Sequence, residues 1–415
     1  MTRHDPIASL ASLHREFGEH GGVNVSIEPS TTFTVLDPAT MPAIFQGQIN
    51  HDQGGCYLYG RHFNPTVVSL GKQLAAIEGG EAGYATASGM SAISCTLLQY
   101  LDSGDHVVAS NTLYGGTYAL LQTFLPKKAN VTTSFVDSSN LDAVEAAMTP
   151  KTKVLYVEAV SNPMLRIADV PRLAEIAHKH GAILVVDGTF APLMITAIPL
   201  GADVVVHSIT KFINGASDII AGAIIGPATL QGELMDLHCG ALMLTGPTMD
   251  PRMAYEISAR LPHLGLRMAE HARRAQFYAE KMSERNLRVI YPGLPEHPDH
   301  ELLKSLMNPG FGFGGILCLD LGDAEKAEQF MAHLQNENHF GLLAVSLGYH
   351  DTLMTRPAAS TSSEMSLEAL TEAGILPGLV RMSVGYTGTL QERWSQLESA
   401  LDAVQPPTRG KALVL

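Results

Sequence analysis

Short apolar runs alternate with helical stretches between about residue 64 and residue 260, and this alternation constrains the fold more than any other feature of the chain. Four of the runs are His106–Ser110, Val154–Glu158, Ile183–Asp187 and Asp203–His207. Such runs are typical of strands that are buried on both faces. Strands that alternate with helices indicate an α/β fold, in which a mostly parallel sheet is covered by helices on both sides.

The chain before and after this region predicts two further parts. We expect residues 1–62 to form an irregular N-terminal arm with a turn at Asp52–Gly55 and one helix near Ile7–Phe17. The large domain is expected over residues 63–262 and a smaller C-terminal α+β domain over residues 263–415. The C-terminal prediction rests on helical stretches at Met268–Arg285, Ala324–Gln335 and Leu390–Val404 and on strand-like segments at Gly315–Leu321 and Leu379–Val384.

Composition excludes several classes of protein. The chain has 415 residues with 27 Lys and Arg against 41 Asp and Glu, so its net charge is −14. Such a surface repels nucleic-acid phosphates and anionic membranes, and we expect neither as a partner. We expect no signal peptide and no membrane-spanning segment. The four cysteines form no C-x-x-C pair and the 17 histidines no H-E-x-x-H motif, which favours a reducing cytoplasm and argues against a metal site.

Two of the buried runs lead to ionisable residues. Ile183–Asp187 ends in Asp187, and Asp203–His207 continues through a polar turn to Lys211. The carboxyl ends of the strands form the edge at which open α/β sheets bind ligands. A lysine and an acid at that edge suit pyridoxal 5'-phosphate (PLP), because the lysine holds this cofactor as a Schiff base and the acid keeps its pyridine nitrogen protonated. Taken alone, the lysine would also fit an ordinary solvated loop.

Two other segments could bind the phosphate of such a cofactor. Around Ser88 and Gly89 the sequence predicts a short strand, a tight turn and a helix start, whose backbone N–H groups can bind an anion that Gly89 lets approach closely. Ser208 and Thr210 lie in the turn before the lysine and could donate hydroxyl hydrogen bonds to the same phosphate. An ordinary helix cap and a solvated turn would show the same patterns.

Four further polar residues are candidates for the same site. Arg61, in the arm, offers a bidentate guanidinium for phosphate and is placed to complete a neighbouring subunit's site, although taken alone it would fit an ordinary arginine on a loop surface. Tyr114 can stack on a planar ring and act as an acid or base, although a half-buried core tyrosine would show the same pattern. Asn162 could donate to a ring oxygen or a carboxylate, although a turn residue before proline would look the same. Arg381 lies within an apolar strand and needs a partner, which either a substrate carboxylate or an internal acid could supply.

Taken together, a series of segments resembles the Cys/Met-metabolism, or trans-sulfuration, PLP enzymes. This family includes methionine γ-lyase, cystathionine γ-lyase and γ-synthase, cystathionine β-lyase and O-acylhomoserine sulfhydrylase. The matching segments, in the family's order, are Tyr59–Thr66, Leu74–Gly80, Ala87–Ala92, Leu113–Thr117, Glu158–Pro163, Val186–Thr189, His207–Phe212, Ala344–Gly348 and Leu379–Gly385. The resemblance implies PLP fold type I, the aspartate-aminotransferase-like α/β fold, and a homodimer with shared sites that usually pairs into a homotetramer.

The resemblance also implies a role for each candidate residue. Lys211 would carry the Schiff base and shuttle protons, Tyr114 would stack on the ring and assist the leaving group, and Asp187 would pair with the pyridine nitrogen. The residues implied at the phosphate are Ser88, Gly89, Met90, Ser208 and Thr210, joined by Tyr59 and Arg61 from the partner subunit. Asn162, Ser346 and Arg381 would hold the substrate or the ring oxygen.

The family's chemistry sets the expected reaction. We expect a carbon–sulfur lyase that acts by γ-elimination on L-methionine or a related homoserine-derived amino acid, giving a 2-oxo acid, ammonia and a thiol. A γ-replacement enzyme of the cystathionine γ-synthase or O-acylhomoserine sulfhydrylase type and a cystathionine lyase are the alternatives within the family. A PLP-binding protein without catalytic activity and a scaffold without cofactor are the alternatives outside it.

Several positions depart from the family's usual pattern. Gly116 stands where methionine γ-lyases typically carry a cysteine, and Gly188 follows the acid where asparagine is common. Val345 is apolar where cystathionine γ-lyases tend to have an acid, which disfavours the distal amino group of cystathionine and favours a short thioether or an activated homoserine. The segments Tyr349-His350 and Tyr386–Gly388 are also atypical, and Arg356 is a candidate second anion contact.

Overall fold

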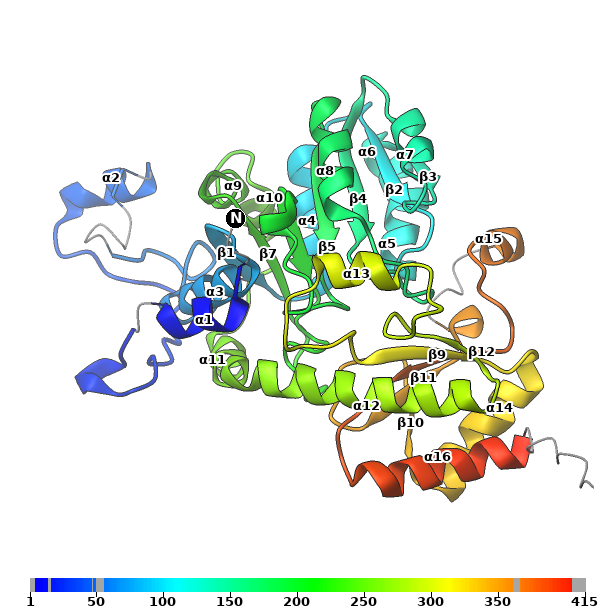
Figure 1. Cartoon of the computed structure of the whole chain (residues 1–415). Coiled ribbons are helices and arrows are strands. Elements are labelled where there is room, and N and C mark those ends of the chain that lie inside the picture. Colours follow the sequence, from blue (N-terminus) through cyan, green and yellow to red (C-terminus); the bar gives the residue numbers. More distant parts are fainter. Residues whose placement is uncertain (1–3, 14–15, 47, 50–55, 361–365, 405–415) are drawn as a thin grey trace, which may run out of the picture.

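The computed structural model describes residues 4–13, 16–46, 48–49, 56–360 and 366–404 (Figure 1). A large α/β body carries an N-terminal arm on one side, and a smaller sheet with its helices lies beneath the body. None of the helices in the described part is both long and apolar enough to cross a membrane. The α/β fold with a mostly parallel sheet, expected from the alternation of apolar runs, is confirmed.

The large body is built on a seven-stranded sheet with the order β1-β7-β6-β5-β4-β2-β3. The strands are β1 (Ala82–Thr86), β2 (His106–Ser110), β3 (Thr132–Val136), β4 (Thr152–Glu158), β5 (Ile183–Asp187), β6 (Val204–His207) and β7 (Gly222–Gly226). All neighbours are parallel except β7, which is antiparallel to both β1 and β6. The parallel strands therefore end at one shared edge, where Asp187 lies.

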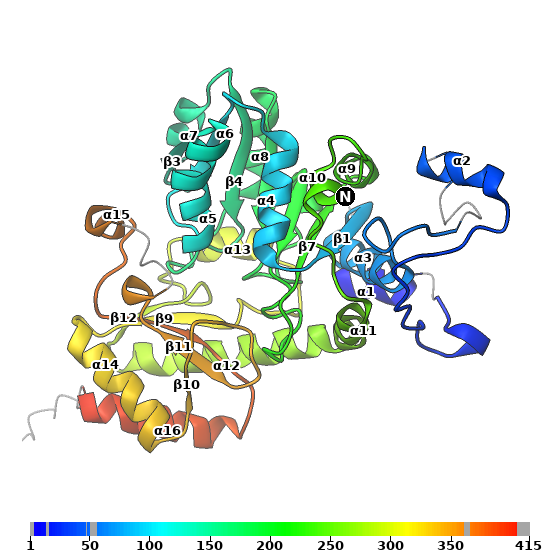
Figure 2. The ribbon, with the colours of Figure 1, turned by 180° about the vertical axis from the view of Figure 1, so that it is seen from behind.

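Helices cover both faces of this sheet because its strands are apolar on both sides. In β5, Leu184 and Val186 face one core and Val185 faces the other. Helices α4 and α8 lie on opposite faces, as the front and back views show (Figures 1 and 2). The helices of this body are α3 (Pro65–Glu78), α4 (Gly89–Tyr100), α5 (Gly115–Ala119), α6 (Leu125–Ala129), α7 (Leu141–Ala147), α8 (Val170–Lys179), α9 (Ala228–Leu234), α10 (Ala241–Thr245) and α11 (Pro251–Arg260).

The C-terminal part contains a five-stranded sheet with the order β10-β11-β12-β9-β8. Its strands are β8 (Arg288–Ile290), β9 (Ile316–Asp320), β10 (Gly341–Leu343), β11 (Thr352–Thr355) and β12 (Leu379–Ser383), and its helices are α12 (Leu264–Glu284), α13 (His300–Leu306), α14 (Ala324–Ala332), α15 (Leu367–Glu372) and α16 (Leu390–Val404). In β12, Val380 and Met382 pack into the core of the C-terminal part, whereas Leu379 belongs to a core shared with the large body. The alternation therefore turns Arg381 toward the large body.

The arm projects from the rest of the molecule (Figures 1 and 2). It contains helices α1 (Pro6–Ser12) and α2 (Met41–Phe45). Helix α1 is the predicted N-terminal helix, although it ends before Phe17; the predicted turn at Asp52–Gly55 lies outside the described residues. Single helical turns occur in the chain at Glu19–Gly21, Pro38–Thr40, Leu120–Phe124, Ile198–Leu200, Leu261–His263, His333–Glu337 and Pro357–Ala359.

Candidate active site

A cavity of about 240 Å³ opens at the carboxyl edge of the large sheet. Strands β4, β5 and β6 and the start of α4 supply one side, and the C-terminal part supplies the other. All the predicted site residues line this cavity except Tyr59 and Arg61. The predicted residues that it brings together are Ser88, Gly89, Met90, Tyr114, Asn162, Asp187, Ser208, Thr210, Lys211, Ser346 and Arg381.

Lys211 reaches the cavity from the turn that follows β6. Its Nζ donates a hydrogen bond of 3.0 Å to Ser346 Oγ, which joins the two sides of the cavity. Burial, together with the nearby charge of Arg381, lowers the pKa of Lys211 to about 8. A neutral amine, the form that can act as a base or a nucleophile, is therefore far more accessible here than for a solvated lysine.

Asp187 lies at the end of β5 and is buried. Its carboxylate accepts hydrogen bonds from the backbone N–H of Thr189, at 2.9 Å, and from the hydroxyl of Tyr156, at 3.3 Å. Burial raises the pKa of Asp187, which its bonds to Thr189 oppose only in part. A cationic ring nitrogen would supply the opposite charge that this buried carboxylate lacks.

Glu158 also lines the cavity, and our sequence reasoning did not single it out. One carboxylate oxygen accepts the N–H of Tyr114 and the other accepts the N–H of Asn162, each at 2.7 Å. Burial and the neighbouring Asp187 raise its pKa. The signal was present in the sequence, because Glu158 ends β4 just as Asp187 ends β5, and the two residues are paired in the register of the sheet.

Arg381 brings a buried positive charge to the cavity; only 2% of its surface is exposed. Its guanidinium donates to the side-chain oxygen of Asn162 at 2.8 Å and to the carbonyl of Ser346 at 3.3 Å. No carboxylate of a described residue forms an ion pair with it, so the internal acid that the sequence left open as its partner is not found. An arginine held by neutral oxygens at a cavity wall is suited to bind an anion from solution.

The start of helix α4 forms another part of the wall. Ser88 caps this helix, since its hydroxyl accepts the N–H of Ser91 at 3.0 Å. The N–H groups of Gly89 and Met90 occupy the first helical positions, which have no acceptor within a helix and remain available to an anion. A Cβ added to Gly89 would lie 2.7 Å from that of Ser208, so glycine is required for this close approach.

The hydroxyl of Thr210 has a second task besides lining the cavity. It accepts the N–H of Ala221 at 2.9 Å and donates to the carbonyl of the same residue at 3.2 Å. These bonds tie the turn that contains Lys211 to the start of β7. The predicted solvated-turn alternative does not apply to Thr210, because its hydroxyl is engaged in the fold.

The mouth of the cavity is apolar. Tyr114 is 43% exposed and lies over Gly116, where an added Cβ would stand 2.6 Å from the tyrosine ring. Ile220 and Val345 line the same mouth and are 72% and 70% exposed. Phe190 and Leu347 extend the apolar lining inward. This wall contains no charged group that would match a distal amino group of a substrate.

The other singled-out residues lie away from this cavity. Arg61 donates to the carbonyl of Met243 at 2.7 Å, with its guanidinium 5.6 Å from the ring centre of the exposed Tyr59. Arg356, the candidate second anion contact, forms an ion pair with Glu328 at 2.9 Å and is not part of the cavity lining. In the atypical segments, the ring of Tyr349 contacts that of His350 in a tilted arrangement, and Tyr386 packs edge-on against the buried His271.

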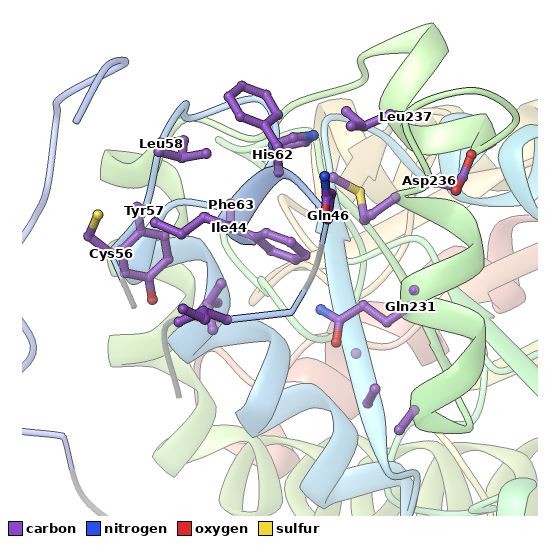
Figure 3. Close-up of a pocket in the computed structure, with 18 of the residues that line it drawn as sticks. Ile44, Gln46, Cys56, Tyr57, Leu58, His62, Phe63, Gln231, Asp236 and Leu237 are labelled. Atoms are coloured by element: carbon purple, nitrogen blue, oxygen red, sulfur yellow. The ribbon is translucent and has the colours of Figure 1, made fainter. Parts of the chain in front are cut away.

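A larger hollow of about 790 Å³ lies between the arm and helix α9 (Figure 3). Ile44, Tyr57 and His62 line it from the arm, and Gln231 and Asp236 line it from α9 and the residues that follow. It contains none of the predicted site residues. Size alone therefore does not identify the reactive site, whereas the gathering of Lys211, Asp187 and Arg381 does.

The residues of the smaller cavity fit PLP. A lysine with a lowered pKa faces the space, and an acid that forms no ion pair with a described residue lies beneath it. The N–H groups at the start of α4 and the hydroxyl of Ser208 lie on one wall. The glycine at position 89 lets Ser208 pack closely against the start of α4, so that both lie on that wall. Arg381 adds a separate site for a carboxylate, which an amino-acid substrate would bring.

Comparison with known proteins agrees with this assignment. Methionine γ-lyase from Arabidopsis thaliana is 55% identical over 397 residues, which cover 95% of this chain and 90% of that protein. The crystal structure of cystathionine γ-synthase from Xanthomonas oryzae matches with a TM-score of 0.86 and 31% identity over 97% of this chain and 99% of the other. A structure described as an O-acetylhomoserine (thiol)-lyase from Campylobacter jejuni, which contains a pyridoxyl-lysine phosphate group, matches with a TM-score of 0.87 and 27% identity over 96% of this chain and 100% of the other.

The match to a family model is equally extensive. The model of the "Cys/Met metabolism PLP-dependent enzyme" family aligns with residues 9–401, which include every predicted site residue. The resemblance inferred from the sequence is thereby confirmed. The chain belongs to the Cys/Met-metabolism family of PLP-dependent enzymes.

Proposed function

We propose that this protein is a PLP-dependent carbon–sulfur lyase that converts L-methionine, or a related homoserine-derived amino acid, into a 2-oxo acid, ammonia and a thiol by γ-elimination. The observation that carries the proposal is the 55% identity to methionine γ-lyase over 95% of the chain. The cavity supports it, because a reactive lysine, a buried acid and an anion-binding arginine surround one space. Water is the only co-reactant that this reaction needs.

In this proposal, each of the cavity residues contacts a different part of the cofactor. Lys211 is the covalent attachment point, and Asp187 holds the proton on the pyridine nitrogen. Tyr114 stacks on the ring, and Asn162 donates to the ring oxygen. The phosphate is bound by Ser88, Gly89, Met90 and Ser208, with the backbone N–H groups of Gly89 and Met90 as the main donors. Thr210 would contribute by holding the turn in place, because its hydroxyl proton is already donated to the carbonyl of Ala221.

Bound PLP supplies an electron sink that makes the Cα proton of the amino acid acidic. Lys211 then serves as the base, because its lowered pKa makes the neutral amine available near neutral pH. Its hydrogen bond to Ser346 on the opposite side of the cavity supports this role, because the amine would then reach the space in which Cα and Cβ would lie. Tyr114, on the open side of the cavity, would protonate the departing sulfur.

Arg381 determines the orientation of the substrate in this proposal. Its buried fork, fixed by Asn162 and by the carbonyl of Ser346, would bind the α-carboxylate. The side chain of the amino acid would then extend toward the apolar mouth formed by Ile220 and Val345. A methyl thioether fits this apolar surface, whereas the distal ammonium of cystathionine would find no acidic partner among Ile220, Val345, Phe190 and Leu347.

The arm is proposed to contribute residues to the active site of a second copy of the chain. Tyr59 and Arg61 are exposed and lie outside their own chain's cavity, which supports a role at the phosphate of a partner subunit. We therefore propose a homodimer with shared sites, paired into a homotetramer as is usual in the family. We also propose a division into an arm (1–62), a large domain (63–262) and a C-terminal domain (263–415); the turn at Leu261–His263 between α11 and α12 supports the second boundary.

We propose that the protein works in the cytoplasm, in contact with a free amino-acid pool. Two observations support this. All four cysteines are free, and Cys95 and Cys318 are buried singly rather than paired. The acidic net charge of −14 also disfavours adsorption to anionic membranes.

The test begins with the visible absorbance of the purified protein. We expect the yellow colour of lysine-bound PLP, its loss in Lys211→Ala, and release of 2-oxobutyrate and methanethiol from L-methionine. O-Acetylhomoserine supplied with a thiol serves as the competing reaction. If a thioether formed from that mixture while methionine gave no 2-oxobutyrate, the protein would be a γ-replacement enzyme, and a protein that PLP cannot reconstitute would refute the proposal altogether.

A further inference from the structure

Glu78 and His207 form a fully buried acid–imidazole pair behind the cofactor site. His207 is the last residue of β6, and Glu78 is the last residue of α3. The two ends meet with 2.7 Å between His207 Nε2 and Glu78 Oε1, and each side chain is only 1% exposed. None of the roles proposed above uses this pair, although His207 immediately precedes Ser208.

The pair is incompletely satisfied, which makes it costly to keep. Glu78 Oε2 and His207 Nδ1 are buried and have no hydrogen-bond partner among the described residues. A buried polar atom without a partner destabilises the folded state, because it has lost its hydrogen bonds to water. A buried ion pair is often no more stabilising than apolar residues of the same size. A contribution to stability therefore does not explain why the pair is present. Its location behind the cofactor site is the more informative observation.

The imidazole of His207 lies directly against the residue that follows Asp187. A Cβ added to Gly188 would stand 2.5 Å from the ring's Cε1 and 2.9 Å from its Nε2. The ring therefore occupies the space that any side chain at position 188 would need. Gly188 and His207 are matched: the absence of a side chain at 188 is what allows the ring to pack there.

Hydrogen bonds continue from this contact into the cofactor site. The N–H of Gly188 donates to the carbonyl of Val206, and the N–H of Ser208 donates to the hydroxyl of Thr189 at 2.8 Å. Thr189 in turn donates its N–H to Asp187 at 2.9 Å. The turn after β5 and the turn after β6 are thus held together on the cavity side by these bonds and on the opposite side by the ring of His207.

The electrostatics favour the same arrangement. Burial raises the pKa of Asp187, and the bonds to Thr189, a positive charge on His207 and the hydroxyl of Tyr156 oppose this rise. Glu78 faces the imidazole from α3, with 2.7 Å between its Oε1 and His207 Nε2. The pair could then support an ionised Asp187 without taking up any space in the cavity.

We propose that the Glu78–His207 pair is a positioning element of the PLP site, which holds the Asp187–Thr189 turn and Ser208 in register from behind the sheet. The proposal rests on the roles assigned above to Asp187 and Ser208. Gly188 belongs to this positioning element, because the absence of a side chain there makes room for the imidazole of His207. Glu78 and His207 touch neither substrate nor cofactor, so they act only through the residues that do.

The test compares three readouts in the apoenzyme and the PLP-loaded protein. They are the PLP Kd of the apoenzyme, the circular dichroism of the bound cofactor's visible band, which reports its fixed orientation, and the Tm of the apoenzyme. Glu78→Gln removes the charge at constant size, and Gly188→Ala displaces the ring without removing a polar group. We expect each to raise the PLP Kd by about tenfold, the lower end of the effect of supporting residues in metal sites, and to weaken the circular dichroism band.

A matched control separates positioning from packing. His106 is also a buried histidine in the large sheet, bonded to Thr152 and Ser134 and absent from the cavity, so His106→Gln should lower the Tm and leave PLP binding unchanged. The effect of Gly188→Ala should shrink when His207→Ser is added, because the clash is then relieved. Wild-type PLP Kd and circular dichroism in both Glu78→Gln and Gly188→Ala, whatever their Tm, would overturn the proposal; if one variant does not fold, the other decides. Uptake of PLP by the wild-type apoenzyme tests the proposed function separately.

Discussion

The cavity around Lys211 and the N-terminal arm differ in how far their side chains are exposed to solvent. In the cavity, Asp187 and Arg381 are buried and held by short hydrogen bonds from their own chain. In the arm, Tyr59 is 45% exposed, and the apolar Leu36 and Val23 are 101% and 82% exposed. The reactive groups of the cavity thus come from one chain, whereas the arm exposes apolar surface that the proposed second copy of the chain would cover.

The largest effect is expected from Lys211→Ala. If the cavity alone contains the proton-transfer chemistry, turnover of methionine should fall by about 10⁴-fold, the upper range for loss of a general base. The control is Lys326→Ala, which removes a surface lysine paired with Asp323 and should leave the rate unchanged. If the Lys211→Ala protein kept more than a tenth of the wild-type rate, another residue would have to act as the base.

Arg381→Leu should come next. This substitution replaces the buried guanidinium with an apolar side chain and so removes the anion site. Because the contact between a buried charge and the substrate carboxylate is lost, kcat/KM should fall by about 10²–10³-fold. Arg356→Ala is the matched control, because Arg356 is paired with Glu328 outside the cavity. Equal losses of kcat/KM in the two variants would show that Arg356 contacts the substrate after all.

Tyr114→Phe separates ring stacking from proton transfer. It keeps the aromatic face and removes only the hydroxyl, so kcat should fall by about 10²-fold with little change in KM or in the PLP Kd. Steady-state kinetics with L-methionine measure this, and Tyr118→Phe, on the adjoining helix but outside the cavity lining, is the control. An unchanged kcat would assign protonation of the leaving sulfur to another group.

The arm is tested by mixing two inactive subunits, Arg61→Ala and Lys211→Ala. If each site takes its lysine from one chain and its arginine from the other, random pairing in a symmetric dimer restores about a quarter of the wild-type activity. The measurement is turnover after verified subunit exchange. No recovery would mean that Arg61 serves its own chain or has no role at the phosphate, and the contrast between arm and cavity would disappear.

The same contrast explains what could be predicted from the sequence. Strands β2 and β5 were predicted to the residue, because a run that is apolar on both faces is a local signal. Lys211 and Asp187 followed from the rule that ligands bind at the carboxyl edge of such a sheet. The role of Arg381 needed the tertiary structure, since only packing could show that its fork meets neutral oxygens instead of an acid.

Other features depend on contacts between distant segments and have no local signal. Glu78 and His207 are 129 positions apart, and nothing in either segment predicts that they meet. The backbone N–H groups that bind Glu158 come from two separate turns. The arm is the extreme case, because the proposed partner of Arg61 belongs to a different molecule and no contact within the chain could reveal it.

The smallest effect is expected on the stability of the apoenzyme. This effect also tests most directly whether one chain alone excludes water from the cavity. Burial and Arg381 lower the pKa of Lys211 from 10.5 to about 8, so between these values the unfolded chain binds more protons than the folded chain. Stability from this group therefore rises with pH across that window, and the penalty for burying the charged amine is fully present below pH 8. Lys211→Met removes the penalty, so its apoenzyme should have a Tm a few degrees above the wild type at pH 7, and the difference should vanish as the pH approaches 10.5. Thermal unfolding of both apoenzymes at several pH values measures this. A difference in Tm that did not change with pH would mean that the amine is solvated in the folded apoenzyme, and that the cavity, like the arm, needs a second subunit to exclude water.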